Sequence, residues 1–166
     1  MRMTLLSLTA LAVFVGSLAG CEKPPPPKEV KEAPAQPTFD EKAEVAAINK
    51  LRDAFSLAIA EKRYGDLKGA TTPDVKVAPP GCEEWQKMRE AGKDRGPFPY
   101  DKIEMTPIET VILNHDTAYD FGNSKVYFKD ENGEEHVLTD TFLVILKKVD
   151  GQWKLHREVG SCSVVK

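Results

Sequence analysis

Two aspartates in the C-terminal half of the chain have the surroundings best suited to acid–base chemistry. Asp120 alternates with Ala118 and Gly122 in a strand-like segment, so it shares one face with two small residues. If that face lines an interior, Asp120 could donate or accept a proton; if the strand is bulged, Asp120 is solvated, and we favour the solvated alternative. Asp140 alternates with apolar residues but lies near the end of its segment, where we expect exposure. Neither lies in a motif that assigns a role, so both are weak catalytic candidates and we assign no catalytic residue.

A cation and a phenol could bind a ligand in the same part of the chain. Arg157 alternates with Trp153 and Leu155, which predicts that it points to the same side as these apolar residues. A guanidinium stays protonated at ordinary pH, so Arg157 cannot be a general base, but it could hold an anion through two parallel hydrogen bonds. Tyr100 lies among aromatic residues of a connecting segment and could border an interior. Arg157 and Tyr100 are therefore our candidate ligand-binding residues.

The first of three cysteines lies directly after an apolar run. The run Leu5–Ala19 follows a single basic residue and is short of the roughly 20 residues that a membrane-spanning helix needs. Its end, Leu18-Ala19-Gly20-Cys21, resembles the lipobox of bacterial lipoproteins, where the signal is cut before a cysteine that receives acyl chains such as palmitate. The resemblance implies a signal peptide over residues 1–20 and lipidation of Cys21. The alternative is a transmembrane anchor with an incidental cysteine.

A lipid anchor at Cys21 would tether the protein to a membrane of the bacterial cell envelope, with its domain in the periplasm or outside. It would also leave Cys82 and Cys162 as an even pair in an exported protein, which predicts a disulfide between them. The competing hypothesis is that one of them is a nucleophile served by a histidine. No CxxC or HxxxH spacing points to zinc, and we expect no cofactor.

The 166-residue chain is long enough for one domain, and its formal net charge is −3. Removal of residues 1–20 would take away Arg2 and no acidic residue, which makes the net charge −4. Without a block of Lys or Arg, we expect no nucleic-acid partner. Residues 22–37 contain six prolines, so we interpret 21–38 as a lipidated, extended linker and 39–166 as the domain.

The pattern of apolar residues within this domain changes from a helical to a strand period. Thr38 and Glu41 form a capping box before a helical stripe, and Gly65 is the expected end of that helix. A second helix is expected over 83–91, and Asn132-Gly133 and Asp150-Gly151 are hairpin signals. The expected strands cover 75–78, 103–114, 117–121, 125–129, 136–148 and 152–159. The order predicts an α+β fold with a bent sheet around the long helix.

Four segments, "EKRYGDL", "DVKVAPPG", "HDTAYDFG" and "KKVDGQWKLHREVGS", together resemble the nuclear transport factor 2-like superfamily, in particular its SnoaL-like, ketosteroid-isomerase-related branch. The resemblance covers about residues 40–163. It implies a cone-shaped barrel in which a long N-terminal helix packs on a curved antiparallel sheet and encloses a cavity. It also implies a homodimer through the outer face of the sheet.

The resemblance implies a fold more than a function, because this fold carries isomerases, dehydratases and binding modules. The isomerase relatives use a tyrosine and two aspartates, and Tyr64, Asp120 and Asp140 do not complete that set by matching positions. Relatives often have a histidine four residues after the tryptophan, whereas here it is His156, one residue early. We therefore expect a domain that binds a small molecule or a partner protein without catalysis. The alternatives are an isomerase or dehydratase for an apolar substrate, with Asp120 or Asp140 as base, and a dimerising scaffold with a filled cavity.

Overall fold

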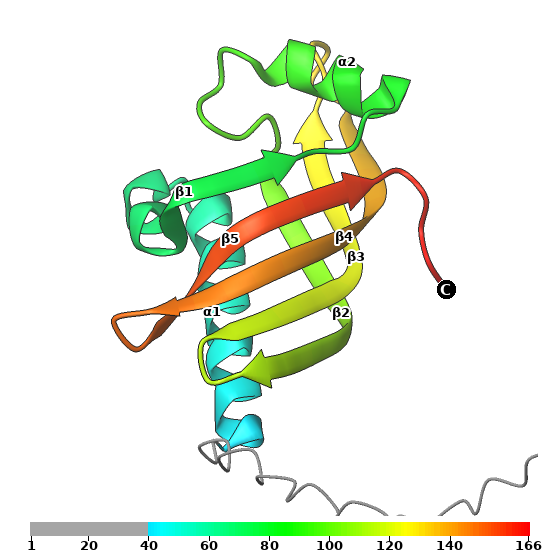
Figure 1. Cartoon of the computed structure of the whole chain (residues 1–166). Coiled ribbons are helices and arrows are strands. Elements are labelled where there is room, and N and C mark those ends of the chain that lie inside the picture. The colour runs from blue at the N-terminus through cyan, green and yellow to red at the C-terminus, as the bar shows by residue number, and fades with distance from the viewer. Residues whose placement is uncertain (1–39) are drawn as a thin grey trace, which may run out of the picture. The chain divides into compact units, whose positions relative to one another are not determined.

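A computed structural model describes residues 40–166 (Figure 1). The predicted signal peptide, linker and lipidation site, residues 1–20, 21–38 and Cys21, lie outside the described residues. The elements in chain order are α1 (Glu41–Ala60), a 3-10 helix η1 (Tyr64–Gly69), β1 (Thr71–Ala78), α2 (Glu83–Gly92), β2 (Lys102–Asn114), β3 (Thr117–Lys129), β4 (Glu135–Val149) and β5 (Gln152–Ser161). No helix in residues 40–166 combines the length and the apolarity needed to cross a bilayer.

Helix α1 forms where the apolar stripe predicted it, but both of its ends differ from the prediction. Asp40 is the N-cap, and its side chain accepts a hydrogen bond from the backbone amide of Ala43 at 3.1 Å. The prediction that Thr38 caps this helix is therefore wrong. The helix ends at Ala60, and Lys62 takes the positive φ of 57° that we had expected of Gly65.

The five strands form one sheet in the order β1-β5-β4-β3-β2. Neighbours from β2 to β5 are antiparallel, and the hairpin signals are confirmed, since Gly133, Asp150 and Gly151 have positive φ. Strand β1 lies beside β5 and parallel to it (Figure 1). The prediction of a wholly antiparallel sheet is wrong at this edge, because no hairpin links β1 to β5 and sets its direction.

Strand β3 is continuous where two strands were predicted, and Gly122 lies at its middle. A Cβ added to Gly122 would lie 2.4 Å from the carbonyl oxygen of Thr106 and 2.8 Å from Cζ of Phe142. Opposite it, the register of β2 shifts between Pro107 and Glu109. A shift of this kind bends a strand, and the glycine lets the two backbones approach closely at the bend.

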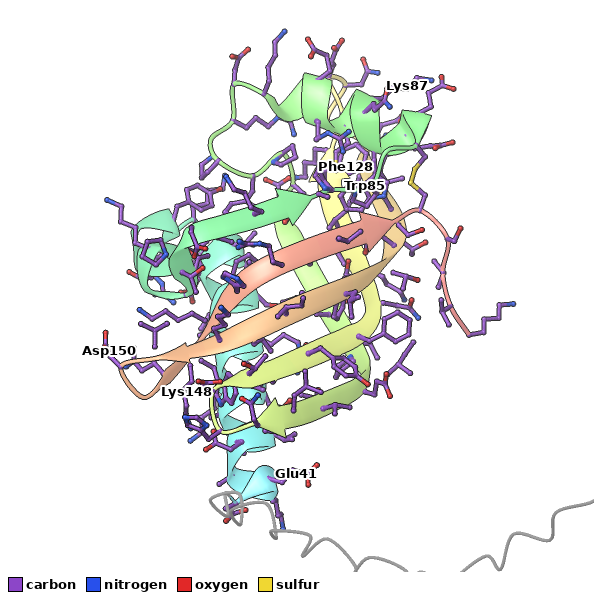
Figure 2. All side chains as sticks on the ribbon, in the orientation of Figure 1. Glu41, Trp85, Lys87, Phe128, Lys148 and Asp150 are labelled. Atoms are coloured by element: carbon purple, nitrogen blue, oxygen red, sulfur yellow. A yellow bond between two sulfur atoms is a disulfide. The ribbon has the colours of Figure 1, made fainter. Side chains whose placement is uncertain are left out.

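Two apolar clusters form the core on the inner, concave face of the sheet. The first packs under α1 and consists of Ile48, Ile112, Ala118, Leu146 and Trp153. The second lies under α2 and contains Trp85, Met88 and Val126, with the cysteines Cys82 and Cys162 packed against it (Figure 2). These cysteines form the predicted disulfide, which joins the start of α2 to the residue after β5. Side chains from both clusters border the cavity described next.

Candidate functional site: an apolar cavity with carboxylates

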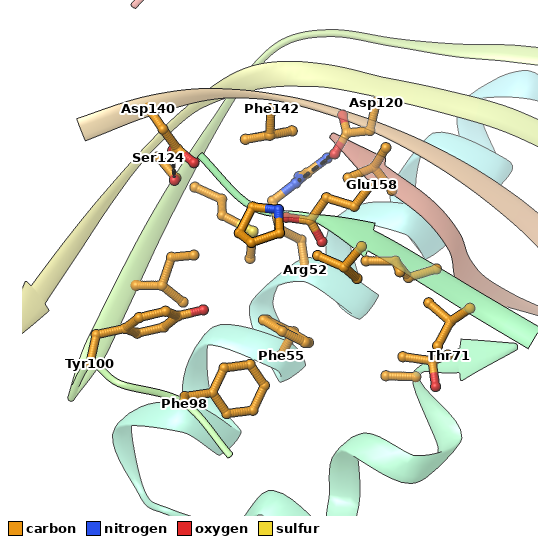
Figure 3. A pocket seen from close by; sticks show the side chains of 18 of the residues that line it. Arg52, Phe55, Thr71, Phe98, Tyr100, Asp120, Ser124, Asp140, Phe142 and Glu158 are labelled. Atoms are coloured by element: carbon orange, nitrogen blue, oxygen red, sulfur yellow. Dashed lines mark hydrogen bonds and ion pairs between the residues drawn. The ribbon is translucent and has the colours of Figure 1, made fainter. Parts of the chain in front are cut away.

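A cavity of about 340 Å³ lies on the concave face of the sheet. Its walls come from α1, α2, the strands and the segment 97–100, and most of the lining side chains are apolar. Aromatic rings form one side: the Phe98 ring centroid lies 5.8 Å from Phe55, 5.8 Å from Tyr64 and 5.6 Å from Tyr100. Figure 3 shows Tyr100, Phe98 and Phe55 on one side of this space, with the labelled carboxylates on the other.

Asp120 is buried in the cavity wall and paired with an arginine, which corrects the expectation that it is solvated. Its side chain faces inward because β3 is not bulged against β4. Arg52 of α1 donates from Nη2 and Nε to Oδ2 of Asp120, at 2.7 and 3.1 Å. Thr110 donates to the other carboxylate oxygen at 2.7 Å. With both carboxylate oxygens bonded to neighbouring side chains, Asp120 is a structural partner of Arg52 and Thr110.

Asp140 is also buried, with only 5 % of its surface exposed, so the expectation that it is exposed is wrong. It lies nine residues before the end of β4, well inside the strand, which extends from Glu135 to Val149. Burial raises the pKa of the Asp140 carboxyl, and a hydrogen bond from the Ser124 hydroxyl opposes that rise. No cation is paired with Asp140 among residues 40–166.

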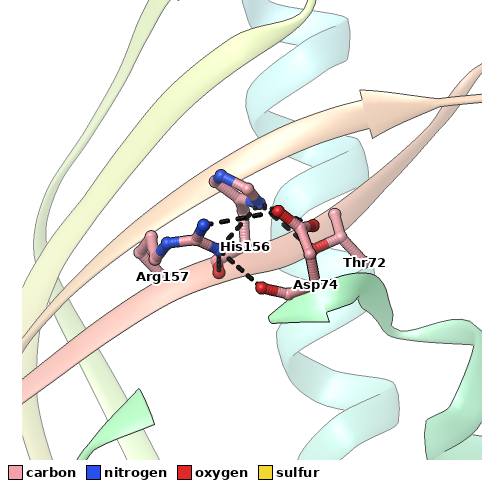
Figure 4. Close-up of polar contacts among 4 residues, drawn as sticks. All are labelled: Thr72, Asp74, His156 and Arg157. Carbon is pink, nitrogen blue, oxygen red and sulfur yellow. Dashed lines mark hydrogen bonds and ion pairs between the residues drawn. The ribbon is translucent and has the colours of Figure 1, made fainter. Parts of the chain in front are cut away.

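Arg157 points away from the cavity, so its predicted place among the lining residues is wrong. Leu155 pairs with Leu146 and Arg157 pairs with Ile145, which leaves His156 as an extra, bulged residue in β5. Arg157 donates instead to the backbone carbonyl of Asp74 at 2.9 Å (Figure 4). The bulge reverses the alternation that the prediction assumed.

The same bulge turns Glu158 toward the cavity, a residue that the sequence did not single out. Burial, with the nearby Asp140 carboxylate as the second cause, raises the pKa of Glu158 to about 7. No hydrogen-bond or ion-pair partner for its carboxylate occurs within residues 40–166. Figure 3 shows this carboxylate projecting into the space that the Tyr100 hydroxyl also faces.

Tyr100 lines the cavity, the position considered for it from the sequence, and its ligand binding stays a prediction. Burial raises the pKa of its phenol above the ordinary value of 10, and the charges of Glu158 and Asp140 raise it further. The phenol therefore stays protonated and can donate a hydrogen bond at any ordinary pH. Trp85 belongs to the core, as expected, and its indole N–H has no hydrogen-bond partner in the described part of the chain.

Sequence reasoning missed several polar residues of the cavity, among them Arg52, Ser124 and Glu158. Arg52 lies four residues after buried Ile48, so the helical period could have placed it on the inner face. Ser124 follows Asp120 by two strand periods, which is a usable signal once β3 is continuous. Nothing in the sequence marks Glu158, because a bulge without glycine or proline leaves no local pattern.

A second group of potential ligand atoms lies outside the cavity, at the β3–β4 hairpin. Oxygens of Asp130 and Glu134 and a ring nitrogen of His136 lie within 4.8 Å of one another. His136 contacts Asp130 at 3.0 Å, and Glu134 and His136 are exposed, so these groups form an ordinary solvated turn.

The cavity can do two things chemically. Its apolar and aromatic walls can take up an apolar molecule, and its carboxyls can meet a polar group on that molecule. A carboxyl with a pKa of about 7 is present in both forms at neutral pH, so it can either donate or accept a proton.

No protein-family model and no curated protein match the chain in sequence. Several solved structures share its fold. A ketosteroid isomerase-like protein from Erwinia carotovora atroseptica SCRI1043 is 19 % identical over 74 % of this chain and 97 % of its own, with a TM-score of 0.55.

An NTF-2-like protein of unknown function from Shewanella oneidensis MR-1 is 17 % identical over 71 % of this chain and 98 % of its own, with a TM-score of 0.52. A putative calcium/calmodulin dependent protein kinase II association domain from Xanthomonas campestris is 22 % identical over 76 % and 91 %, with a TM-score of 0.51. At these identities the likeness concerns the fold. The chain has the NTF-2-like cone fold, with helices on a curved five-stranded mixed sheet.

Proposed function

We propose that the chain is a lipoprotein of the bacterial cell envelope, tethered through Cys21, whose domain binds a small molecule in the cavity without turnover. The observation that carries the binding function is the cavity of about 340 Å³ with mostly apolar walls. Ligand sites in proteins commonly have volumes from roughly 300 to 1,000 Å³ and combine such walls with few polar groups. A scaffold with a filled interior would lack this space.

Binding without catalysis is supported by the positions and partners of Asp120 and Arg157, two of the candidate site residues predicted from the sequence. Asp120 accepts two hydrogen bonds from Arg52 on one carboxylate oxygen and one from Thr110 on the other, so both oxygens are already engaged within the protein. Arg157 lies on the outer side, bonded to Asp74. Anion binding by Arg157 inside the cavity is therefore not part of the proposal.

The binding function can be tested with the neutral fluorescent probe 1-N-phenylnaphthylamine. The full chain, reconstituted in lipid nanodiscs, should enhance the fluorescence saturably above empty nanodiscs. Leu155→Trp and Val75→Phe, which fill the cavity from two strands, should each abolish this signal, whereas Leu57→Trp on the exposed side of α1 should not. Unchanged binding by both filled variants, with melting temperatures that show them folded, would refute the cavity as the site.

The tether is supported by the Leu18–Cys21 sequence and by a disulfide that suits an oxidising compartment. Mass spectrometry of the protein isolated from bacterial membranes should give an N-terminus at Cys21 with acyl chains attached. Cys21→Ser should leave residues 1–20 in place and remove the acyl mass. A mature protein that begins elsewhere without lipid would overturn this part of the proposal.

A second candidate function, acid–base catalysis, is favoured by one specific observation. Glu158 combines a pKa of about 7 with a position facing the protonated phenol of Tyr100, and one solved structure with this fold is named ketosteroid isomerase-like. In this alternative, Glu158 replaces Asp120 as the base. The test is deuterium incorporation next to the carbonyl of an apolar ketone such as 2-tetralone. Acceleration that Glu158→Gln removes would establish catalysis, and no acceleration would leave binding alone.

Self-association is the third part of the proposal, and it concerns the outer face of the sheet. Phe121, Leu143 and Val159 pair across β3, β4 and β5 in one row, and Ile145 lies beside them. Leu143, Ile145 and Val159 are 42, 38 and 55 % exposed. An apolar row of this kind suits a homodimer, and one structure with the same fold is an association domain by name.

A further inference from the structure

The charges that line the cavity are unequal, and the unbalanced ones are negative. The lining includes the basic residues Arg52 and Arg89 and the acidic residues Asp120, Asp140 and Glu158. Arg52 is bonded to Asp120 at 2.7 Å, so this pair is neutral as a unit. Asp140 and Glu158 have no ion-pair partner within residues 40–166. Two carboxyls therefore face one apolar space without a cation.

Arg89 of α2 does not supply the missing cation. Its Nη1 donates to the backbone carbonyl of Pro80 at 2.8 Å, at the connection between β1 and α2. If Arg89 neutralised Glu158, it would hold the pKa of that carboxyl down, but the pKa is raised. The charge that acts on Glu158 is the Asp140 carboxylate, which repels it.

The opposite side of the cavity is aromatic. Phe98 is in contact with Phe55 and Tyr100, and all three rings line the space. Aromatic faces attract cations through their quadrupole, most strongly where water is excluded, and they recognise quaternary ammonium groups in this way. Carboxylates and aromatic rings around an apolar space are thus complementary to the same kind of ligand.

We propose that the cavity selects an apolar molecule that carries an amine or quaternary ammonium cation, held between the carboxylates of Asp140 and Glu158 and beside the rings of Phe98 and Tyr100. This inference rests on the proposed binding function and names its ligand class. The cation supplies the counter-charge that the two carboxylates lack among residues 40–166, and the rest of the molecule covers the apolar walls.

The affinity of the cavity for a cation should depend on pH. The groups that face Glu158 are Asp140 on β4, Tyr100 in the segment before β2, and the Arg52–Asp120 pair of α1 and β3, with Arg89 on α2 also lining the space. Tyr100 stays neutral at ordinary pH, and Asp140 acts on Glu158 as a negative charge, so the group with a pKa near neutral is Glu158. A cation binds the ionised form, so its affinity should rise as pH rises through about 7. A neutral ligand that accepts a hydrogen bond from the protonated carboxyl would show the reverse.

Two probes of equal shape test the charge preference: phenyltrimethylammonium and its uncharged isostere tert-butylbenzene. Neither titrates, so any pH dependence belongs to the protein. Displacement of 1-N-phenylnaphthylamine from the full chain in nanodiscs gives both affinities, with empty nanodiscs as the blank. At pH 8 the ammonium should bind about tenfold more tightly than the isostere. Its affinity should fall about tenfold between pH 8 and pH 6, because the ionised fraction of Glu158 falls by that factor. Binding of tert-butylbenzene should not change.

Matched variants assign the effect to the cavity. Glu158→Gln should remove the pH dependence and reduce the preference for the ammonium, and Asp140→Asn should reduce the preference as well. Glu131→Gln, in the exposed hairpin, should leave both unchanged. Melting temperatures show whether each variant is folded, and the two cavity variants serve as independent tests.

The outcomes separate the two proposals. If the fluorescent probe binds but the ammonium binds no better than tert-butylbenzene at pH 8, the ligand class is wrong and cavity binding stands. If the preference survives in both Glu158→Gln and Asp140→Asn, the carboxylates are not its source and the inference is wrong. If no probe enters the cavity, the proposed binding function itself fails.

Discussion

Arg52 of α1 and Asp120 of β3 form an ion pair in the cavity wall, with Nη2 and Oδ2 2.7 Å apart and side-chain exposures of 10 and 7 %. Replacing one partner leaves the other charge buried without compensation. Asp120→Asn should therefore destabilise the protein by about 3 kcal/mol or more in urea unfolding.

The control for this prediction is Asp94→Asn in the exposed segment after α2, which should change stability by less than about 0.5 kcal/mol. The double variant Arg52→Met/Asp120→Leu should lose less stability than Asp120→Asn alone, because no lone charge remains. If the loss of the double variant equals the sum of the losses of Arg52→Met and Asp120→Leu measured singly, the two residues are not coupled.

The disulfide between Cys82 and Cys162 closes a loop of 80 residues in sequence. In the chain-entropy treatment, a loop of this length contributes up to about 4.5 kcal/mol to stability. Cys82→Ser, Cys162→Ser and the double variant should lose similar amounts of the free energy of unfolding, since each removes the same link. Two free thiols in mass spectrometry of the exported protein would contradict the bond itself.

The stability of the protein should depend on pH through Glu158. Its pKa in the folded protein, about 7, lies above the ordinary value of 4.5, so between these values the folded state retains a proton that the unfolded chain has released. The contribution to stability is therefore greatest below about pH 4.5, falls as pH rises to about 7, and stays low above it. The total change is on the order of 3 kcal/mol at most.

Urea unfolding of the natural protein and of Glu158→Gln at pH 5 and pH 8 isolates this contribution, because other groups cancel in the difference. The variant should be the more stable protein at pH 8 and should lose less stability between the two values. Glu131→Gln should follow the natural protein. Parallel pH curves for the natural protein and Glu158→Gln would show that Glu158 is solvated.

We expect the protein to self-associate through the exposed apolar row on the outer face of the sheet. Leu143→Asp places a charge in the apolar row formed with Phe121 and Val159, where a dimer would bury it. Light scattering of the detergent-solubilised chain should give a dimer mass, and the variant should weaken association at least tenfold, equivalent to about 1.4 kcal/mol. Leu57→Asp on α1 is the matched exposed control. A monomer at high protein concentration would refute the dimer.

Periodicity in the sequence predicted α1, α2 and the positions of the hairpins, because these depend on local patterns, but it divided β3 into two strands. The disulfide followed from counting cysteines after Cys21 was set apart. Local patterns did not reveal the bulge at His156. Because of this bulge, Glu158 and not Arg157 points to the inner face of the sheet. The burial of Asp120 depends on Arg52, 68 residues away, and no local rule links the two.

The backbone at Gly122 and the side chains that line the cavity control different properties of the cavity: the first its shape, the second its polar groups. The register shift in β2 bends the sheet, and Gly122 permits the close approach of β3 to Thr106 and Phe142, so the space on the concave side depends on the backbone. Side chains such as Glu158 and Ser124 supply the polar groups on the wall of this space. Exchanging one of them would change the polar groups that a ligand meets, whereas a methyl group at Gly122 would meet the Thr106 carbonyl oxygen and the Phe142 ring and force the strands to shift. The shape of the cavity therefore depends on a residue that is not among those that line it.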